Sequence, residues 1–355
     1  MFSAESLRRR TTEMVALLAV LAAAAACSTG TTNSSSDGTK HYTLSVGLTG
    51  AAAAEADVFI AEAEGYFAAE NLTVNVQVVG STVAAEVAAG DINVALVGAT
   101  SALAPTAQGH PMKIFYSALP GELGANVLVR SGSPFKSLMD LSGKKVAVLG
   151  VGTASYGDGV SYSNYVASHG GKPFQLVPAT SAAALVSELI SGQVDAELGE
   201  TDEYASYIDS HRIRVLASGT SAVVKKNIMP SDILGASYMT LASFASSNGP
   251  ALTAFVIGLR KADHFLQTQS AKVIAQALKK SSQFGNVSES SLEQQIPFAR
   301  PFYAPTAGEI TMQGWKDSLA EFGTWGLQNV DVKSALYSYG NMIDMTFWKT
   351  AASGT

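Results

Sequence analysis

The sequence predicts an α/β protein built from two doubly wound units, and three observations lead to this. Segments in which large apolar residues alternate with small or polar ones recur between segments with apolar residues at helical spacing. The composition, 47% apolar and 15% charged, fits a large core and excludes a disordered chain. The length beyond about residue 40 suits two domains. Strands alternating with helices imply largely parallel sheets covered on both faces.

The first 40 residues are interpreted as a leader followed by a tether. Arg8 to Arg10 precede an apolar stretch from Met14 to Ala26, which predicts a signal peptide over 1–26. As a helix this stretch spans only about 20 Å, too short to cross a membrane. The small residues before Cys27, the only cysteine, resemble a bacterial lipobox, although Ala24 stands where leucine is usual. We expect a lipid on Cys27 and a flexible Ser/Thr/Gly-rich tether over 27–40. An ordinary signal peptide with an incidental Cys27 is the alternative.

The first unit is predicted to consist of alternating strands and helices. The segments are a strand at 42–48, a helix within 51–67, a strand at 72–79, a helix at about 81–89, a strand at 92–97, a helix from Thr100 and a strand at 113–118. Gly65 is expected to end its helix with a positive φ. Phe67 is expected to be a core residue rather than a ligand contact.

The second unit repeats this plan. Strands are expected at 144–150, 174–178 and 193–199, with helices at 155–170 and 181–192 between them; a strand at 238–243, a helix at about 250–269 and a mostly helical tail with a clear helix in 310–323 follow. Aligning Gly90 with Gly192 places Gly98 opposite Glu200, each at the end of a strand. This similarity indicates either a duplicated plan or chance in an alanine-rich chain.

Four segments, 61–79, 87–100, 137–156 and 186–200, together resemble a known family. They are AEAEGYFAAENLTVNVQVV, VAAGDINVALVGAT, SLMDLSGKKVAVLGVGTASY and VSELISGQVDAELGE. Their motifs and order are similar to those of extracytoplasmic solute-binding proteins of ABC importers, in the branch of nitrate-, sulfonate- and taurine-binding proteins and binders of thiamine-pyrimidine precursors. Asn71 and Asn93 depart from the pattern, since glycine and aspartate are common there.

The resemblance implies a periplasmic binding protein type 2 fold, in which a hinge crossed twice joins two lobes. It places lobe 1 at 41–128 plus 240–355 and lobe 2 at 129–239, with crossings near 127–131 and 236–241. It further implies a monomer, without cofactor or catalytic turnover, that captures a small organic solute outside the cytoplasmic membrane. The solute would pass to the transmembrane subunits of an ABC permease.

Ligands of open α/β sheets gather beyond the carboxyl ends of the strands, near helix N-termini. The residues so placed, including one at the second crossing, are Thr49, Gly50, Ser81, Gly98, Thr100, Ser117, Thr153, Ala154, Ser155, Tyr156, Thr180, Glu200 and Tyr238. Small residues allow close approach, hydroxyls donate hydrogen bonds, and tyrosine can cover a planar solute. These loops contain no lysine or arginine but do contain Glu200. They therefore favour a neutral or amine-bearing solute and leave sulfonate and nitrate open.

Other functions fit the sequence less well. GVGTAS at 150–155 resembles a dinucleotide-binding loop, but Ser155 replaces the third glycine and no suitable acid follows. The chain has no G-x-S-x-G, H-E-x-x-H or C-x-x-C motif, and its five histidines lack metal-ligand spacing. A net charge of −6 disfavours nucleic acid. Two alternatives remain: an enzyme of the same fold resembling pyrimidine synthases, whose cysteine-rich iron-binding segment is absent here, and a solute-sensing lipoprotein.

Overall fold

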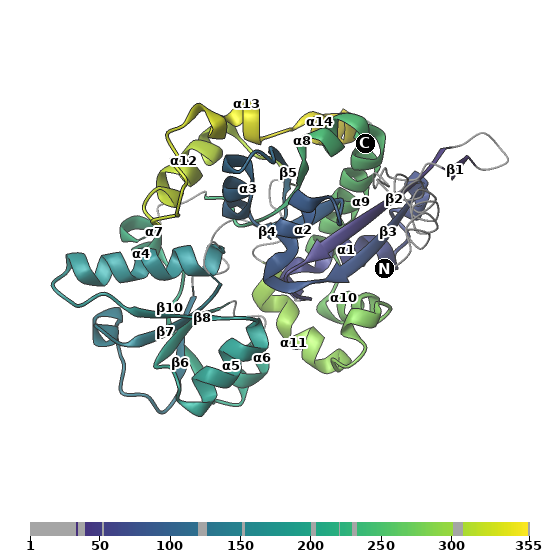
Figure 1. Ribbon diagram of the computed structural model, residues 1–355. Helices are drawn as coiled ribbons and strands as arrows, with labels where there is room; N and C mark the ends of the chain where they lie inside the picture. The colour runs from purple at the N-terminus through teal and green to yellow at the C-terminus, as the bar shows by residue number, and fades with distance from the viewer. Residues whose placement is uncertain are drawn as a thin grey trace, which may run out of the picture.

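The computed structural model describes residues 33–34, 40–51, 53–119, 126–150, 153–199, 204–219, 221–228, 233–300 and 308–353. Two mixed β-sheets with helices on their faces make up these residues (Figure 1). We call the first sheet with its helices lobe 1 and the second lobe 2. This architecture confirms the predicted α/β class with two lobes. The predicted signal peptide and Cys27 lie outside the described residues. The flexible tether expected over 27–40 is corrected in part, because Asn33 and Ser34 form a short strand that pairs with residues 40 and 41.

The sheet of lobe 1 runs in the order β1-β2-β4-β11-β5, and β3 pairs with β2. Its strands are β1 (Asn33–Ser34), β2 (Lys40–Leu48), β3 (Leu72–Val78), β4 (Val94–Gly98), β5 (Met112–Ser117) and β11 (Ala236–Leu241). β2 is parallel to β3 and β4, whereas β11 is antiparallel to both β4 and β5. Strands β2 to β5 therefore all end at one edge, where β11 begins.

Helices cover both faces of this sheet. They are α1 (Ala56–Ala63), α2 (Val83–Ala89), α3 (Leu103–Ala107), α8 (Ala242–Ser247), α9 (Gly249–Thr268), α10 (Ala271–Leu278), α11 (Glu289–Ala299) and α14 (Thr346–Ser353). Phe67 is buried and stacks on Phe255 of α9 at 5.1 Å, which confirms its predicted core position. Gly65 has φ +72°, as expected.

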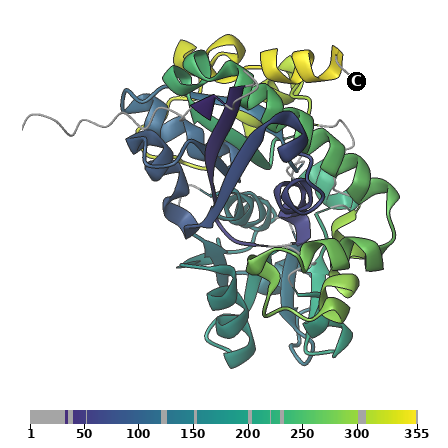
Figure 2. The same ribbon diagram turned by 90° about the vertical axis from the view of Figure 1, so that its right-hand side faces the viewer.

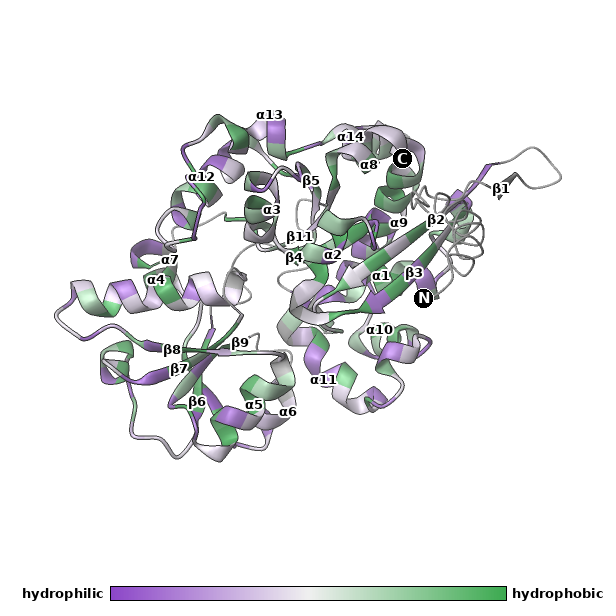
Figure 3. Ribbon diagram, in the orientation of Figure 1, coloured by the Kyte–Doolittle hydropathy of each residue, from purple (hydrophilic) through white to green (hydrophobic). Residues whose placement is uncertain are grey.

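Lobe 2 contains a sheet of order β10-β6-β9-β7-β8. Its strands are β6 (Asn126–Arg130), β7 (Lys145–Leu149), β8 (Gln175–Ala179), β9 (Ala196–Gly199) and β10 (Ile213–Ala217); its helices are α4 (Ala154–Ser168), α5 (Ala182–Ser191), α6 (Ala205–Asp209) and α7 (Ala222–Asn227). β7 is parallel to β8 and β9, and β6 is antiparallel to β9 and β10. Figure 3 shows hydrophobic and hydrophilic residues mixed along α4, which is buried over most of its length.

The chain passes from lobe 1 to lobe 2 between Ser117 and Asn126, and returns between Ala217 and Ala236. The segments expected to form the crossings, 127–131 and 236–241, coincide with β6 in one sheet and β11 in the other. Each crossing is followed directly by a strand, β6 or β11, that runs antiparallel to its neighbours. Both sheets are therefore mixed rather than wholly parallel.

The C-terminal segment returns to lobe 1. It contains α12 (Met312–Phe322) and α13 (Tyr339–Met342), which precede α14. The Lys113 ammonium of β5 donates to the Gly340 carbonyl at 2.8 Å, and the Asp344 N–H donates to the Ile114 carbonyl at 3.0 Å. Figure 1 shows α12 above α4 and α7, between the two lobes. Within the described ranges, no helix has the length and apolar character needed to span a bilayer.

Candidate ligand-binding site

The loops that follow the strands of lobe 1 are brought together by the returning chain. The Ala99 N–H donates to the Gly235 carbonyl at 3.0 Å, and the N–H groups of Ala118 and Leu119 both donate to the Ala236 carbonyl. The Val79 N–H donates to the Leu48 carbonyl at 3.0 Å, which joins the ends of β2 and β3. Backbone pairing therefore aligns one edge, which carries the predicted residues Thr49, Gly50, Ser81, Gly98, Thr100 and Ser117.

The corresponding edge of lobe 2 is organised by hydroxyl groups. The Ser155 hydroxyl accepts from the Leu149 N–H at 3.1 Å and donates to the Leu198 carbonyl at 3.3 Å, so it joins the ends of β7 and β9. Thr153 caps α4 by accepting from the Tyr156 N–H at 3.2 Å. Thr180 lies at the end of β8, directly before α5. Ser155 thus supports the fold of this edge, while Thr153, Tyr156 and Thr180 remain on its more accessible side.

A cavity of about 610 Å³ lies between the lobes. Ala51, the residue after Gly50, lines it from lobe 1, and Ala183, three residues after Thr180, lines it from α5 of lobe 2. Tyr207 of α6 and Leu292 of α11 close one side. Figure 2 shows the two lobes from the direction at right angles to Figure 1. Among the described residues the lining includes none of the predicted ones, but Ala51 and Ala183 place the cavity beside two of the predicted loops, and the rest of the lobe 2 wall follows α5 to Arg212.

Tyr238 lies in the core and not on the cavity wall. Its side chain is 0% exposed, and its hydroxyl donates to Asp57 Oδ1 at 2.7 Å. Its ring packs against Phe115 and Phe255. β11 is an inner strand of a sheet whose two faces are covered by helices, so the side chains in its middle are buried. The expectation that this ring covers a solute is corrected to a supporting role beneath the edge.

Other predicted positions differ in accessibility. Thr100 is buried in lobe 1. Glu200 lies outside the described residues, as do the side chains of Ser81 and Ala154.

Two carboxyl groups that the sequence did not indicate lie under the lobe 1 edge. Glu55 precedes α1 and Asp57 is in its first turn, and both are buried. The Thr49 hydroxyl donates to Glu55 Oε1 at 3.5 Å. Burial raises the pKa of Asp57 to about 6, although the hydrogen bond from Tyr238 lowers it in part. The only sequence signal is the presence of two acids at the start of the helix that follows β2.

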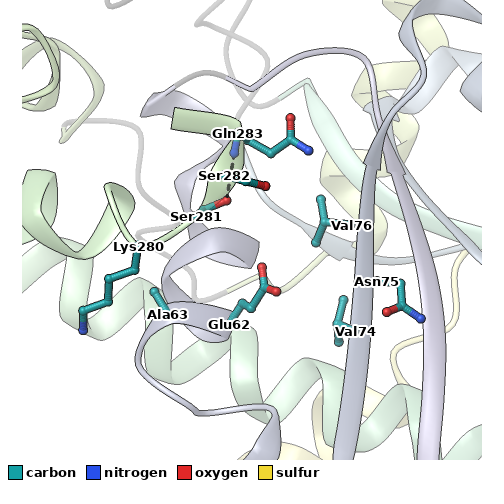
Figure 4. A pocket seen from close by; sticks show the side chains of 9 residues that line it. All are labelled: Glu62, Ala63, Val74, Asn75, Val76, Lys280, Ser281, Ser282 and Gln283. Carbon is teal, nitrogen blue, oxygen red and sulfur yellow. Dashed lines mark hydrogen bonds between the residues drawn. The ribbon is translucent and has the colours of Figure 1, made fainter. Parts of the chain in front are cut away.

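Two further cavities lie away from the strand ends. One of about 530 Å³ is lined by Glu62, Lys280, residues 281–283 and the middle of β3 (Figure 4). Another of about 770 Å³ is lined by Arg130, Lys144 and Arg212, next to the start of β7. Among the described residues no group of His, Cys, Asp and Glu could hold a metal ion. The inter-lobe cavity is therefore the candidate site, because it alone of these three is lined by both lobes next to predicted loops, by Ala51 after Gly50 and by Ala183 after Thr180.

Comparison with known proteins supports this architecture. Residues 53–270 match the family model "NMT1/THI5 like". No curated protein sequence matches the chain. The fold is similar to that of the alkanesulfonate-binding protein SsuA from Xanthomonas axonopodis pv. citri bound to MOPS, with a TM-score of 0.66, 18% identity, and coverage of 82% of this chain and 96% of that one.

Two further solved structures share the fold. The periplasmic nitrate-binding protein NrtA from Synechocystis PCC 6803 has a TM-score of 0.64 and 13% identity, with 88% of each chain covered. The desulfurization enzyme DSZB has a TM-score of 0.58 and 13% identity, with 88% of this chain and 99% of that one covered. These findings confirm the resemblance seen in the sequence motifs. The chain belongs to the NMT1/THI5 like family and has the fold of periplasmic binding proteins.

Proposed function

We propose that this protein captures a small organic solute outside the cytoplasmic membrane, between its two lobes, and delivers it to an ABC-type permease. The observation that carries the proposal is the cavity between the two lobes, which adjoins the loops after β2 and β8 through Ala51 and Ala183. Open α/β sheets bind ligands beyond the carboxyl ends of their strands, where such loops lie. Proteins of the same fold that bind an alkanesulfonate and nitrate support a binding role.

The proposed contacts come from both edges. Thr49, Gly50, Ser81, Gly98 and Ser117 would contact the solute from lobe 1, and Thr153, Ala154, Tyr156, Thr180 and Glu200 from lobe 2. Thr100, Ser155 and Tyr238 would hold these loops in place from beneath, because their side chains are buried.

The charge of the site favours a neutral or amine-bearing solute. The contact loops contain no lysine or arginine, and the one cation in the described lining of the cavity, Arg212, lies directly before β10 and not in these loops. Buried Glu55 and Asp57 lie under the lobe 1 edge, and a carboxylate in a region of low dielectric constant opposes a nearby anion. Backbone N–H groups at the helix starts could still hold a sulfonate or nitrate, so both belong in the screen.

A lipid on Cys27 would hold the domain beside the membrane. The tether over 27–40 would then let the two lobes reach a permease. Stable attachment takes more than one acyl chain, at about 0.8 kcal/mol per buried methylene.

An enzymatic role is the second candidate, since DSZB shares the fold. Recovery of the bound compound separates the two roles. A binding protein returns it unchanged, whereas an enzyme returns a product that mass spectrometry detects after overnight incubation.

The test is a thermal-shift screen with sulfonates, nitrate, pyrimidines, flavins and amines, followed by calorimetry. A binder at about 100 times its Kd should stabilise the native state by about 2.7 kcal/mol. A Cβ at Gly50 meets no atom within 4 Å, so Gly50→Phe should fill the site and weaken binding at least tenfold. Gly132→Phe, equally unhindered but on lobe 2 away from the site, is the matched control. Unchanged affinity in Gly50→Phe would reject this site.

A further inference from the structure

Trp325 joins the C-terminal segment of lobe 1 to α4 of lobe 2. It is 3% exposed, and its indole lies against the backbone of α4 at Gly157. A Cβ at Gly157 would stand 1.9 Å from Trp325 Cε3, far inside any real contact. The ring can therefore lie on this helix only because position 157 is glycine.

Hydrogen bonds reinforce the packing. Trp325 Nε1 donates to Ser161 Oγ at 3.0 Å, and the Ser161 hydroxyl in turn donates to Glu321 Oε1 at 2.5 Å. Ser161 is one turn beyond Gly157 on α4, and Glu321 is on α12. The contact thus combines an aromatic ring with a hydrogen-bonded chain, and both elements take part in it.

A buried acid lies beside this contact. Asp158, also on α4, is 1% exposed. Burial and the neighbouring Glu321 raise its pKa well above the ordinary value. Asp158 is therefore harder to ionise than an exposed aspartate, which lessens the repulsion between its carboxyl group and that of Glu321.

The C-terminal side of the contact is fixed to lobe 1. Trp315 Nε1 of α12 donates to the Tyr337 carbonyl at 2.8 Å, and the Tyr337 hydroxyl donates to the Leu103 carbonyl of lobe 1 at 3.3 Å. The Leu234 N–H, on the returning chain, donates to Ser318 Oγ at 2.8 Å. These hydrogen bonds hold α12 on lobe 1. Trp325 therefore keeps a fixed position relative to lobe 1, and its contact with α4 ties α4 to that position.

The contact lies next to the proposed solute contacts of lobe 2. α4 begins after its cap Thr153, and Tyr156 immediately precedes Gly157. A rotation of lobe 2 away from lobe 1 would move this first turn and would also have to slide Gly157 under the indole. The two events are therefore mechanically linked.

We propose that Trp325 is a positioning residue: its contact with Gly157 sets the orientation of lobe 2 relative to lobe 1 and so places the first turn of α4 for the solute. The second half of this statement depends on the proposed function. The first half concerns the ligand-free protein and is testable without any solute.

The experiment measures the distance between the lobes by pulsed electron paramagnetic resonance in the ligand-free protein. Spin labels are attached through Gln108→Cys in lobe 1 and Lys172→Cys in lobe 2, both exposed, in the Cys27→Ser background. Gly157→Ala is compared with Gly159→Ala. Both lie on α4, but the atoms nearest to the new Cβ at 159 belong to Val148 and Leu176 of lobe 2, at 2.8 and 3.0 Å.

We expect Gly157→Ala to shift or broaden the distance distribution, and Gly159→Ala to keep the wild-type distribution even if it lowers stability. Trp325→Phe, which lacks the indole N–H and part of the ring, should move the distribution in the same direction and serves if Gly157→Ala does not fold. Wild-type distributions in both Gly157→Ala and Trp325→Phe would overturn the inference. Failure of the solute screen would reject the proposed function and leave this result unaffected.

Discussion

Glu197→Gln should make the protein more stable than the wild type at pH 8. Glu197 of β9 is 0% exposed, and its pKa is raised from 4.5 to about 8. Burial is the main cause; the hydrogen bond from the Tyr204 hydroxyl offsets part of the rise, and the neighbouring Glu188 adds a smaller part. In the unfolded chain this carboxyl ionises above pH 4.5, whereas the native state keeps its proton up to about pH 8. The native state therefore loses stability as pH rises through this window.

The magnitude follows from the two pKa values. One unit corresponds to about 1.36 kcal/mol, so a shift from 4.5 to about 8 is worth about 5 kcal/mol in full. Between pH 5 and pH 8 the free energy of unfolding of the wild type should fall by about 3 to 4 kcal/mol. This is less than the full value because the titration is incomplete at both ends of this range. Glutamine has nearly the same volume and cannot ionise, so the variant should lack this loss.

Urea unfolding at pH 5, 6, 7 and 8 measures the effect. The free energy of unfolding of wild type minus that of Glu197→Gln should fall steadily with pH. Glu293→Gln, on the exposed side of α11, is the control and should run parallel to wild type. Parallel profiles for wild type and Glu197→Gln would refute the reasoning that a buried carboxyl in β9 is protonated at neutral pH.

Three further outcomes are expected. Tyr238→Phe removes the 2.7 Å hydrogen bond to Asp57. The variant should lose about 1–3 kcal/mol of the free energy of unfolding in urea, and the pKa of Asp57 should rise above about 6. No loss of stability would contradict the buried pairing. Gly47→Ala places a Cβ 2.7 Å from Val83, so it should lower the free energy of unfolding by about 1–3 kcal/mol. Gly132→Ala, whose new Cβ has nothing within 4 Å, is the control and should lower it far less. Equal effects would count against the packing of β2 on α2. Cys27→Ser should release the protein from membranes into the soluble fraction on cell fractionation, and continued attachment would disprove the lipid anchor.

Local backbone geometry was predictable from the sequence because it depends on residues close in the chain. Gly90 and Gly192, aligned as a repeat, end α2 and α5 with φ of 86° and 81°. Asn71, which stands where the motif resembled by the sequence commonly has glycine, adopts φ 54°, which asparagine tolerates. The strands β2, β3, β4, β7 and β8 were also expected within two residues. β6 and β10 were not expected as strands, because both are short and antiparallel and follow no β-α-β pattern.

The candidate site was predictable only as a set of loops. Parallel strands end at a shared edge, so their following loops must be neighbours. Burial was not predictable in the same way, because it depends on elements far apart in sequence: Tyr238 is covered by α9, and its partner Asp57 is 181 residues away. The contact between Trp325 and Ser161 joins residues 164 apart, and no local pattern encodes it.

The position of β11 has a consequence for how the newly made chain acquires its shape. This strand lies between β4 and β5, yet more than a hundred residues of lobe 2 are synthesised before it. Lobe 2 is continuous from β6 to β10, so it can complete its sheet as soon as it emerges. The sheet of lobe 1 stays incomplete between β4 and β5 until β11 has been synthesised up to residue 241. Chains that stop before this point should therefore hold a finished second lobe beside an unfinished and aggregation-prone first one.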